Sequence, residues 1–345
     1  MKKILVAVIA LGAVAFASCS RDTGVKTLSG EPLLSLNIKL EGMTDPGATR
    51  MTEAAGQTGQ LVLSNGHIFV IDPAGTVIAN AVMNVTTATS AAGQTVNAAV
   101  ATNSRVYILG NIPSNVDVTT LTTFERIRQT AVTISTSQQN NYRNAAMANT
   151  SGQPAAITVS GTTGSVTVEI NPLYSRLELN EVRGGPTITG FTVTGVFVDS
   201  YFPSFTLTGD SSGPIRYQSQ STNFAGVMGD TGNWVATGAA GNMFAVPAAG
   251  QVWAYHMASA DLPRIIVRLE NVTTTGTPQP GTRYLTVTGY SGQAPTRFER
   301  GRIYQITSLT FTDQQLAATP NPTHVPITVI VRQVDWIPTP LTPVV

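Results

Sequence analysis

The residues that most often carry chemistry in proteins are scarce in this sequence. It contains three histidines, His67, His256 and His324, and a single cysteine, Cys19. The histidines are isolated, with no HxxxH or HExxH spacing and no second cysteine to complete a zinc site. We therefore expect no metal centre and no bound cofactor, and we expect the histidines on strand surfaces or in turns.

Motifs for nucleophilic catalysis and phosphate binding are also missing. There is no GxSxG, no P-loop, and no GxGxxG between a strand and a helix. Residues 226–232 (GVMGDTG) lack the lysine that a phosphate cradle needs. Asp199, Asp210 and Asp230 could meet in space, but nothing pairs them as general acid and base. The sequence gives no support for an enzyme.

A group of aromatic residues in the second half admits two interpretations. They could line a carbohydrate platform, or they could pack in a hydrophobic core, and core packing is the interpretation we favour. These residues are Tyr201, Phe202, Phe205, Trp234 and Trp253.

The composition indicates a folded, β-rich protein. The chain has 345 residues and a net charge of +1, so no basic nucleic-acid footprint is present. Val, Thr, Ile, Gly and Ala dominate, and short apolar runs alternate with Gly/Pro turns. This pattern predicts an all-β fold of two sandwich-like domains. We place them at residues 51–172 and 173–345, with the boundary near Pro172.

Some local structure can be predicted along the chain. Residues 117–130 have helical spacing and Asp117 as a plausible N-cap, which predicts a short amphipathic helix. A weaker helical pattern covers residues 137–148. Each half is also expected to begin with two paired strands: residues 33–42 with 61–72, and residues 173–182 with 188–198.

The first 19 residues have the features of a lipoprotein signal peptide. Lys2 and Lys3 form a basic start, and residues 4–17 are apolar but too short to span a membrane. Small residues then lead into Cys19, as in a bacterial lipobox, although Phe16 stands where Leu is usual. The alternative is an ordinary secretory signal with a chance cysteine. A lipid on Cys19 would hold the precursor at a membrane surface.

Two strands near opposite ends of the chain have the same apolar pattern. Each carries four aliphatic residues at alternate positions: Leu34, Leu36, Ile38 and Leu40 in the first, and Val325, Ile327, Val329 and Val331 in the second. Each could fill one row of pockets along a sheet edge, so the two look interchangeable. In the second strand Val334 and Trp336 are in the opposite phase, and a bulge near residues 332–333 would return them to the first face. This strand looks free to be donated.

A turn-rich spacer follows the first strand. Residues 41–50 read EGMTDPGATR and end at Arg50, which is followed by Met51. Exposed, flexible turns are the preferred sites of proteolysis, so the spacer is a plausible cleavage site with Arg50 as its specificity residue. Residues 20–50 would then be a propeptide that carries a removable strand. The alternative is that Arg50 is an ordinary solvated arginine.

The ordered set of motifs resembles one family, the fimbrillins of type V pili in Bacteroidetes. The set comprises the lipobox, the strand and spacer ending at Arg50, LVLSNGHIFVID, SRVYILGNIP, YSRLELNEV, FERGRIYQITSLTF and the closing VPITVIVRQVDW. The resemblance implies two tandem transthyretin-like, Greek-key β-sandwich domains. It also implies a lipidated precursor in the outer membrane, which an arginine-specific protease cuts between Arg50 and Met51. Copies of the subunit would then polymerise by β-strand exchange into a surface fimbrium that supports adhesion.

Two other functions remain open at this stage. The chain could be a tip or accessory fimbrial subunit, which needs an acceptor groove but need not donate a strand. It could instead be a glycan-binding surface lipoprotein that does not polymerise and keeps its lipid. The expected partners are other copies of the chain or related subunits, the maturation protease and the outer membrane, with no nucleic acid.

Overall fold

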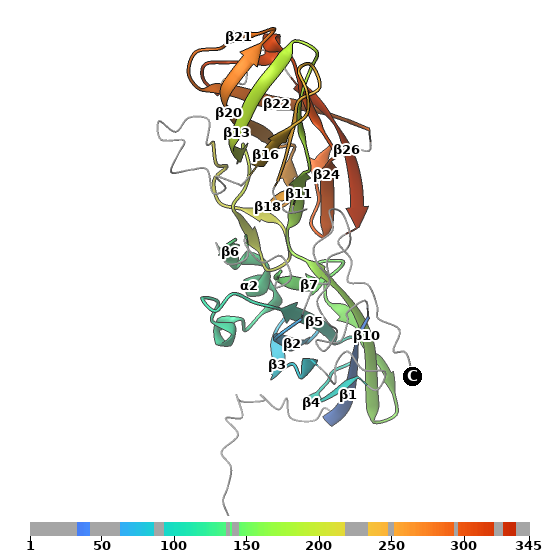
Figure 1. Ribbon diagram of the computed structural model, residues 1–345. Helices are drawn as coiled ribbons and strands as arrows, with labels where there is room; N and C mark the ends of the chain where they lie inside the picture. Colours follow the sequence, from blue (N-terminus) through green and yellow to red (C-terminus); the bar gives the residue numbers. More distant parts are fainter. Residues whose placement is uncertain are drawn as a thin grey trace, which may run out of the picture.

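The protein is an elongated, almost entirely β molecule, as the sequence predicts (Figure 1). The computed structural model describes residues 33–41, 63–85, 93–135, 139, 145–217, 234–247, 252–292, 296–320 and 327–335. Residues 33–172 supply one sheet system, the N-terminal unit, and residues 175–335 supply another, the C-terminal unit. No helix in the described ranges is long and apolar enough to cross a membrane.

The N-terminal unit is a nine-stranded system with the order β3-β2-β5-β7-β10-β1-β4, to which β8 and β9 are added at the side. β10 joins two layers, because its first part pairs with β1 and β9 and its last three residues pair with β7. The strands are β1 (Leu33–Glu41), β2 (Gly66–Ile71), β3 (Val77–Val82), β4 (Gln94–Ala99), β5 (Arg105–Gly110), β7 (Met147–Asn149), β8 (Ala155–Ala156), β9 (Thr158–Ser160) and β10 (Thr163–Pro172).

The C-terminal unit has two sheets. The larger has the order β13-β20-β22-β26-β24-β11-β18 with β21 beside β20, and the smaller has the order β16-β17-β12-β25. Their strands are β11 (Ser175–Leu179), β12 (Val182–Gly184), β13 (Ile188–Asp199), β16 (Trp234–Thr237), β17 (Phe244–Pro247), β18 (Trp253–Met257), β20 (Arg264–Thr274), β21 (Thr277–Pro278), β22 (Arg283–Gly292), β24 (Arg302–Ile306), β25 (Leu309–Phe311) and β26 (Ile327–Asp335). A separate ribbon pairs β19 (Ala260–Asp261) with β23 (Arg297–Phe298), and η5 (Asp313–Gln315) follows β25.

Strand alternation explains why these sequences form sandwiches. Along β10, TGSVTVEI places Val166, Val168 and Ile170 in the core while Thr167 and Glu169 are exposed. A strand buries every second side chain, so a period-two apolar pattern gives one core face and one solvent face. Each unit has its own large cluster of buried aliphatic and aromatic residues.

The predicted strand pairings at the start of each half are wrong. β1 pairs with β10 and β4 rather than with β2, and β11 pairs with β18 and β24 rather than with β13. The strands that begin each half are therefore completed by segments far along the chain. Pairing between sequence neighbours is only a tendency, and Greek-key sandwiches depart from it.

The predicted helix at residues 117–130 is split in two. Asp117 caps a short 3-10 turn, η1 (Val118–Thr120), and the α-helix α2 (Phe124–Gln129) begins later with Thr123 as its N-cap. The interruption has a tertiary cause: the Val77 amide donates to the Thr122 carbonyl, and the Phe124 amide donates to the Gly75 carbonyl. The weaker helix predicted at residues 137–148 is wrong at its C-terminal end, because Met147 and Ala148 belong to strand β7.

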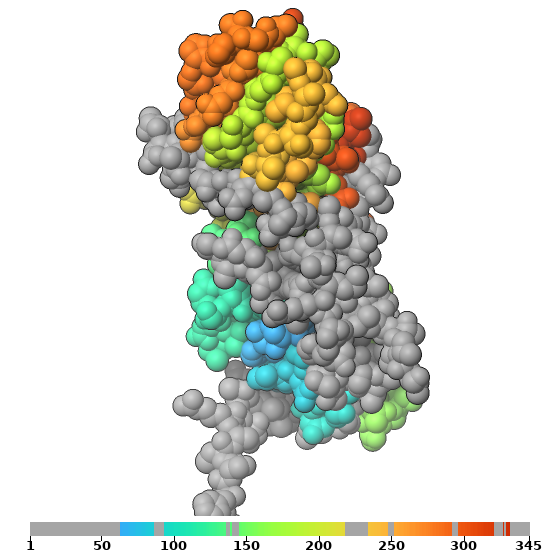
Figure 2. Space-filling model, in the orientation of Figure 1, coloured from blue at the N-terminus to red at the C-terminus, as the bar shows by residue number. Residues whose placement is uncertain are grey.

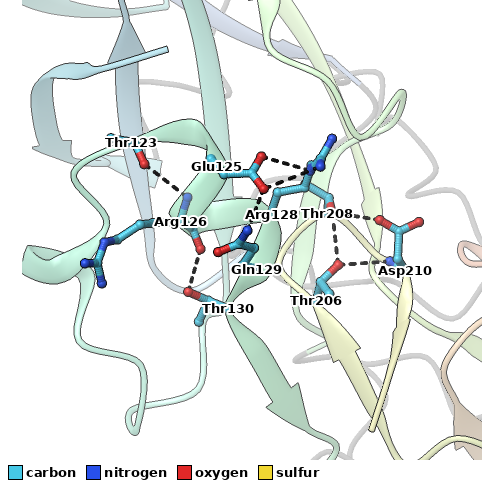
Figure 3. Close-up of polar contacts among 9 residues, drawn as sticks. All are labelled: Thr123, Glu125, Arg126, Arg128, Gln129, Thr130, Thr206, Thr208 and Asp210. Carbon is cyan, nitrogen blue, oxygen red and sulfur yellow. Dashed lines mark hydrogen bonds and ion pairs between the residues drawn. The ribbon is translucent and has the colours of Figure 1, made fainter.

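A small sheet and one arginine join the two units. β6 (Ala131–Thr133) pairs with β14 (Ser204–Thr206), which also pairs with β15 (Ser211–Ser212). Figure 3 shows α2 beside the turn after β14, with Thr206 and Asp210 hydrogen-bonded to each other. Arg300, from the C-terminal unit, donates to the carbonyl oxygens of Thr208 at 2.6 Å and of Asn149 at 3.1 Å, and also to that of Thr150.

Tyr107 adds a second bond at this junction. Its hydroxyl donates to the carbonyl oxygen of Leu207 at 2.9 Å, and burial raises the pKa of the hydroxyl. Burial lowers the pKa of Arg300, and the nearby Tyr107 and Asp210 oppose that change. In Figure 2 the described residues of the two units form opposite ends of the molecule, with β20–β22 in orange at one end. The junction connects the units through backbone and side-chain bonds.

Candidate functional site

The first candidate feature is the place that β1 occupies, which we call the N-terminal slot. β1 lies between β10, to which it is parallel, and β4, to which it is antiparallel. The register places Leu36 opposite Gly164 and Val96, and Ile38 opposite Val166. Because paired residues share a sheet face, the alternate apolar positions of β1 share rows with buried residues.

The walls of the N-terminal slot are mostly buried on one face and exposed on the other. Val96, Ala98, Val166 and Val168 are between 0% and 7% exposed. Opposite the polar positions of β1 the walls carry exposed residues, including Thr95, Asn97, Thr167 and Glu169. If β1 left, an apolar trough and two unpaired strand edges would face the solvent.

The second candidate feature is the place of β26, which we call the C-terminal slot. β26 lies between β22, to which it is parallel, and β24, to which it is antiparallel. Ile327, Val329 and Val331 are 1%, 2% and 1% exposed, whereas Ile330 on the other face is 72% exposed. The strand is therefore seated in the core of the C-terminal unit.

Two sequence expectations about this strand need correction. The strand is not an unpaired end, because both of its edges are paired and its apolar face is buried, so it must leave its own sheet before it could be donated. The bulge expected near residues 332–333 is also absent, since Val331, Arg332, Gln333 and Val334 pair continuously with β24. Val334 therefore stays in the opposite phase, at the position facing Ile303. The register shift in this region is on β22 instead, between Val287 and Gly289.

The two slots have the same strand polarity. In each, a single strand runs parallel to one neighbour and antiparallel to the other and completes a sheet from within. A strand that fits one slot has the direction and the period-two apolar face that the other requires. This arrangement can accommodate the replacement of one strand by another of the same direction.

Several predicted site residues lie outside the described residues. These are Cys19 for lipidation, Arg50 and Met51 for cleavage, and Val325 and Trp336 at the ends of the second strand. Their roles stay predictions. For Leu34, Leu36, Ile38 and Leu40 the structure gives the backbone pairing described above, and their removability likewise stays a prediction.

The residues considered for chemistry do not form a common site. His67 lies on β2 with its Nδ1 3.0 Å from Asn80 Oδ1. The expectation of a strand surface or a turn is wrong for His256, which is fully buried on β18. Asp199 is buried 3.6 Å from Arg264, and Asp210 bonds to Thr208 on a turn. His324 and Asp230 lie outside the described residues. Within the described part of the chain, no cluster of three or more His, Cys, Asp or Glu residues could hold a metal ion.

The aromatic residues mostly pack in the interior. Tyr201, Phe205 and Trp253 are 6%, 0% and 2% exposed, and Phe202 and Trp234 are half-buried. An exposed carbohydrate platform made of these five side chains is therefore not present.

Sequence reasoning found both slot strands but missed the slot walls. The walls are β4, β10, β22 and β24, and nothing in their sequences marks them as neighbours of β1 and β26. The one available signal was the strict alternation of TGSVTVEI in β10. It indicates a half-buried strand but does not identify its partner.

Comparison with known proteins identifies the fold. No protein-family model matches the sequence, and no curated protein matches it. Among solved structures, a fimbrilin, FimA, from Porphyromonas gingivalis aligns over 90% of this chain and 99% of its own, at 12% identity and a TM-score of 0.57. A candidate cell adhesion protein from Bacteroides eggerthii aligns over 90% of this chain and 98% of its own, at 17% identity and a TM-score of 0.59.

The chain has a fimbrillin-like fold. A candidate cell adhesion protein from Parabacteroides distasonis has the same architecture, with 14% identity, a TM-score of 0.55, and coverage of 90% of this chain and 98% of its own. At these identities the similarity establishes the fold.

Proposed function

We propose that this protein is a structural subunit of a cell-surface fimbrium, that it polymerises by β-strand exchange, and that it supports adhesion without being an enzyme. The observation that carries the proposal is the matched geometry of the two slots. Each holds one strand between a parallel and an antiparallel neighbour. The similarity of this fold to that of a fimbrilin of Porphyromonas gingivalis also supports the proposed role as a fimbrial subunit.

In the proposed assembly the precursor is exported as a lipoprotein with its lipid on Cys19. An arginine-specific protease at the outer membrane cuts between Arg50 and Met51, which disconnects β1 from the rest of the chain. β1 then leaves the N-terminal slot, and β26 of another copy enters it. Peptide addition to a sheet edge is a known recognition mode, in which main-chain bonds give affinity and alternate side chains give specificity.

Proteolysis gives the process its direction, because it disconnects β1 from the rest of the chain. Burying an aliphatic side chain is worth ~1.5–3 kcal/mol, so four of them contribute roughly 6–12 kcal/mol as an upper bound. The donor strand must first leave its own slot, where three aliphatic residues are almost fully buried. The burial that β26 loses there is regained in the neighbour's N-terminal slot, the slot that β26 leaves is opened, and the cut β1 segment diffuses away.

A cleavage variant tests the first step. Arg50→Ala should leave a lipidated monomer, whereas Arg21→Ala, which changes the other arginine of the first 50 residues, should still mature and polymerise. The measurements are the N-terminal sequence of surface-extracted protein, expected to begin at Met51, and fibre formation by electron microscopy. Fibres of normal length from the Arg50→Ala variant would contradict the proposal.

A disulfide lock tests the second step. Ser35 and Asn97 are opposite each other on β1 and β4, so Ser35→Cys with Asn97→Cys can tie β1 into its slot after cleavage. We expect the oxidised double variant to be cleaved but not to polymerise, and the reduced one to polymerise. Polymerisation of the locked form at the normal rate would show that the N-terminal slot is not the acceptor.

Deleting residues 325–345 separates a shaft subunit from a tip or accessory subunit. A shaft subunit without its donor strand should end the fibre, whereas a tip subunit should still bind to the subunit below it. A glycan-binding lipoprotein would keep the lipid on Cys19, so mass spectrometry of the surface protein also tests that function.

A further inference from the structure

We propose that Arg332 of one subunit pairs with Glu169 of the next and that this ion pair selects the register in which β26 enters the N-terminal slot. The inference rests on the proposed strand exchange and names the contact between copies that directs it. It begins from a like-charge pair in the precursor: Glu41, at the end of β1, is directly opposite Glu169 on the parallel strand β10.

The apolar patterns of the two strands fix how they align. When Ile327, Val329 and Val331 take the positions of Leu36, Ile38 and Leu40, the next residue of each strand is Arg332 in β26 and Glu41 in β1. Both strands run parallel to one slot wall, so the same polarity applies. Arg332 then takes the position opposite Glu169. The exchange replaces a like-charge pair with an opposite-charge pair.

The setting of Glu169 suits this role. Its side chain is exposed on the outer face of β10, and no ion pair involves it among the residues that the structure describes. In β1 the register position before Glu41 on the same face is Lys39, opposite Thr167. In β26 the residue at that position is Ile330, so Arg332 is the positive charge that remains near Glu169 after exchange.

Other registers lose either the apolar match or the ion pair. A shift by one residue turns Ile327, Val329 and Val331 to the solvent face. A shift of β26 by two residues can move Val331 to the position of Ile38. Gln333 then lies in the apolar row opposite Val168, and Arg332 lies opposite Thr167 instead of Glu169. A shift in the other direction carries Arg332 past the end of the slot. Only the aligned register satisfies both rows.

The test is a charge-swap cycle on the full-length protein cut after Arg50. The probe is a labelled peptide of residues 324–336, as the natural sequence and with Arg332→Glu. Each peptide is bound to the wild-type protein, to Glu169→Arg and to Ser165→Arg. Ser165 is a matched control, because it is exposed on the same face of β10 and lies opposite Asn37, a neutral residue.

We expect the Arg332→Glu peptide to bind the wild-type protein roughly three- to tenfold more weakly than the natural peptide, the size expected for reversing an exposed cross-strand charge pair. The Glu169→Arg protein should instead bind the Arg332→Glu peptide more tightly than the natural peptide. The Ser165→Arg protein should still prefer the natural peptide. High salt should reduce the difference in affinity between the two peptides. Thermal unfolding of the uncut Glu169→Arg protein verifies folding, and that variant should be at least as stable as wild type because Glu41 then faces an arginine.

The outcomes separate this inference from the function on which it rests. If the natural peptide binds the cut wild-type protein but Glu169→Arg shows the same preference as wild type, the ion pair is refuted and strand exchange stands. If the natural peptide binds neither the cut wild-type protein nor its variants, strand exchange through the N-terminal slot is itself refuted, and the ion pair with it.

Discussion

The position of β26 between β22 and β24 predicts that alanine substitutions at two adjacent residues will change the free energy of unfolding very differently. Val329 is 2% exposed and belongs to the core cluster of the C-terminal unit, whereas Ile330 is 72% exposed. Val329→Ala removes two methyl groups at ~0.8 kcal/mol each and leaves a cavity, so the expected loss of unfolding free energy is about 2–3 kcal/mol. Ile330→Ala removes more atoms but should change stability by less than ~0.5 kcal/mol.

Tryptophan fluorescence suits the measurement, because the three tryptophans, Trp234, Trp253 and Trp336, all belong to the second half of the chain. For a unit of this size the loss corresponds to a decrease in Tm of roughly 5–10 °C for Val329→Ala in the full-length protein. Ile330→Ala should unfold within a degree or two of wild type. Equal decreases for the two variants, or a larger one for Ile330→Ala, would refute the seating of β26 between β22 and β24.

Two further predictions concern the junction and the first sheet. Arg300→Ala leaves the carbonyl groups of Thr208 and Asn149 without their charged donor and should cost about 2–4 kcal/mol, measured by denaturant unfolding, whereas the exposed Arg297→Ala should be nearly neutral. An equal cost for both variants would show that Arg300 does not join the units. Gly110→Ala would bring a methyl group to 2.4 Å from Leu63 Cδ1 and should cost ~1–3 kcal/mol by thermal unfolding, while Gly190→Ala, with its nearest neighbour at 3.7 Å, should be tolerated. A neutral Gly110→Ala would contradict this packing.

The sequence predicts strands well here because burial alternates with period two. The pattern in Leu34–Leu40 and in Ile327–Val331 is local, so it can be read without knowing the partners. The burial of Ile327, Val329 and Val331 follows from it directly. The all-β class needed no more than this.

Partner choice could not be predicted, because it depends on distant segments. β1 pairs with residues 94–99 and 163–169, and no residue in any of the three segments specifies the other two. The split helix has the same origin: residues 117–130 have helical spacing, but hydrogen bonds from Val77 and to Gly75 tie Thr122 and Phe124 to the strand β3 side, and Thr123 between them has extended backbone. Tertiary bonds override local preference in both cases.

The seating of β26 places a constraint on any exchange scheme. The precursor has two slots and two strands to fill them, but a subunit that has lost β1 keeps two slots and only β26. Each donated strand therefore fills one slot and opens another, between β22 and β24. The sequence after β26 contains Pro338, Pro340 and Pro343, and proline cannot supply the ladder hydrogen bonds of a central strand. The tail is thus a poor replacement for β26. After exchange, either β22 and β24 would pair directly or the slot between them would stay open. In the proposed exchange, the added cost of that opened slot would favour keeping β26 in its own core until an empty N-terminal slot is available nearby.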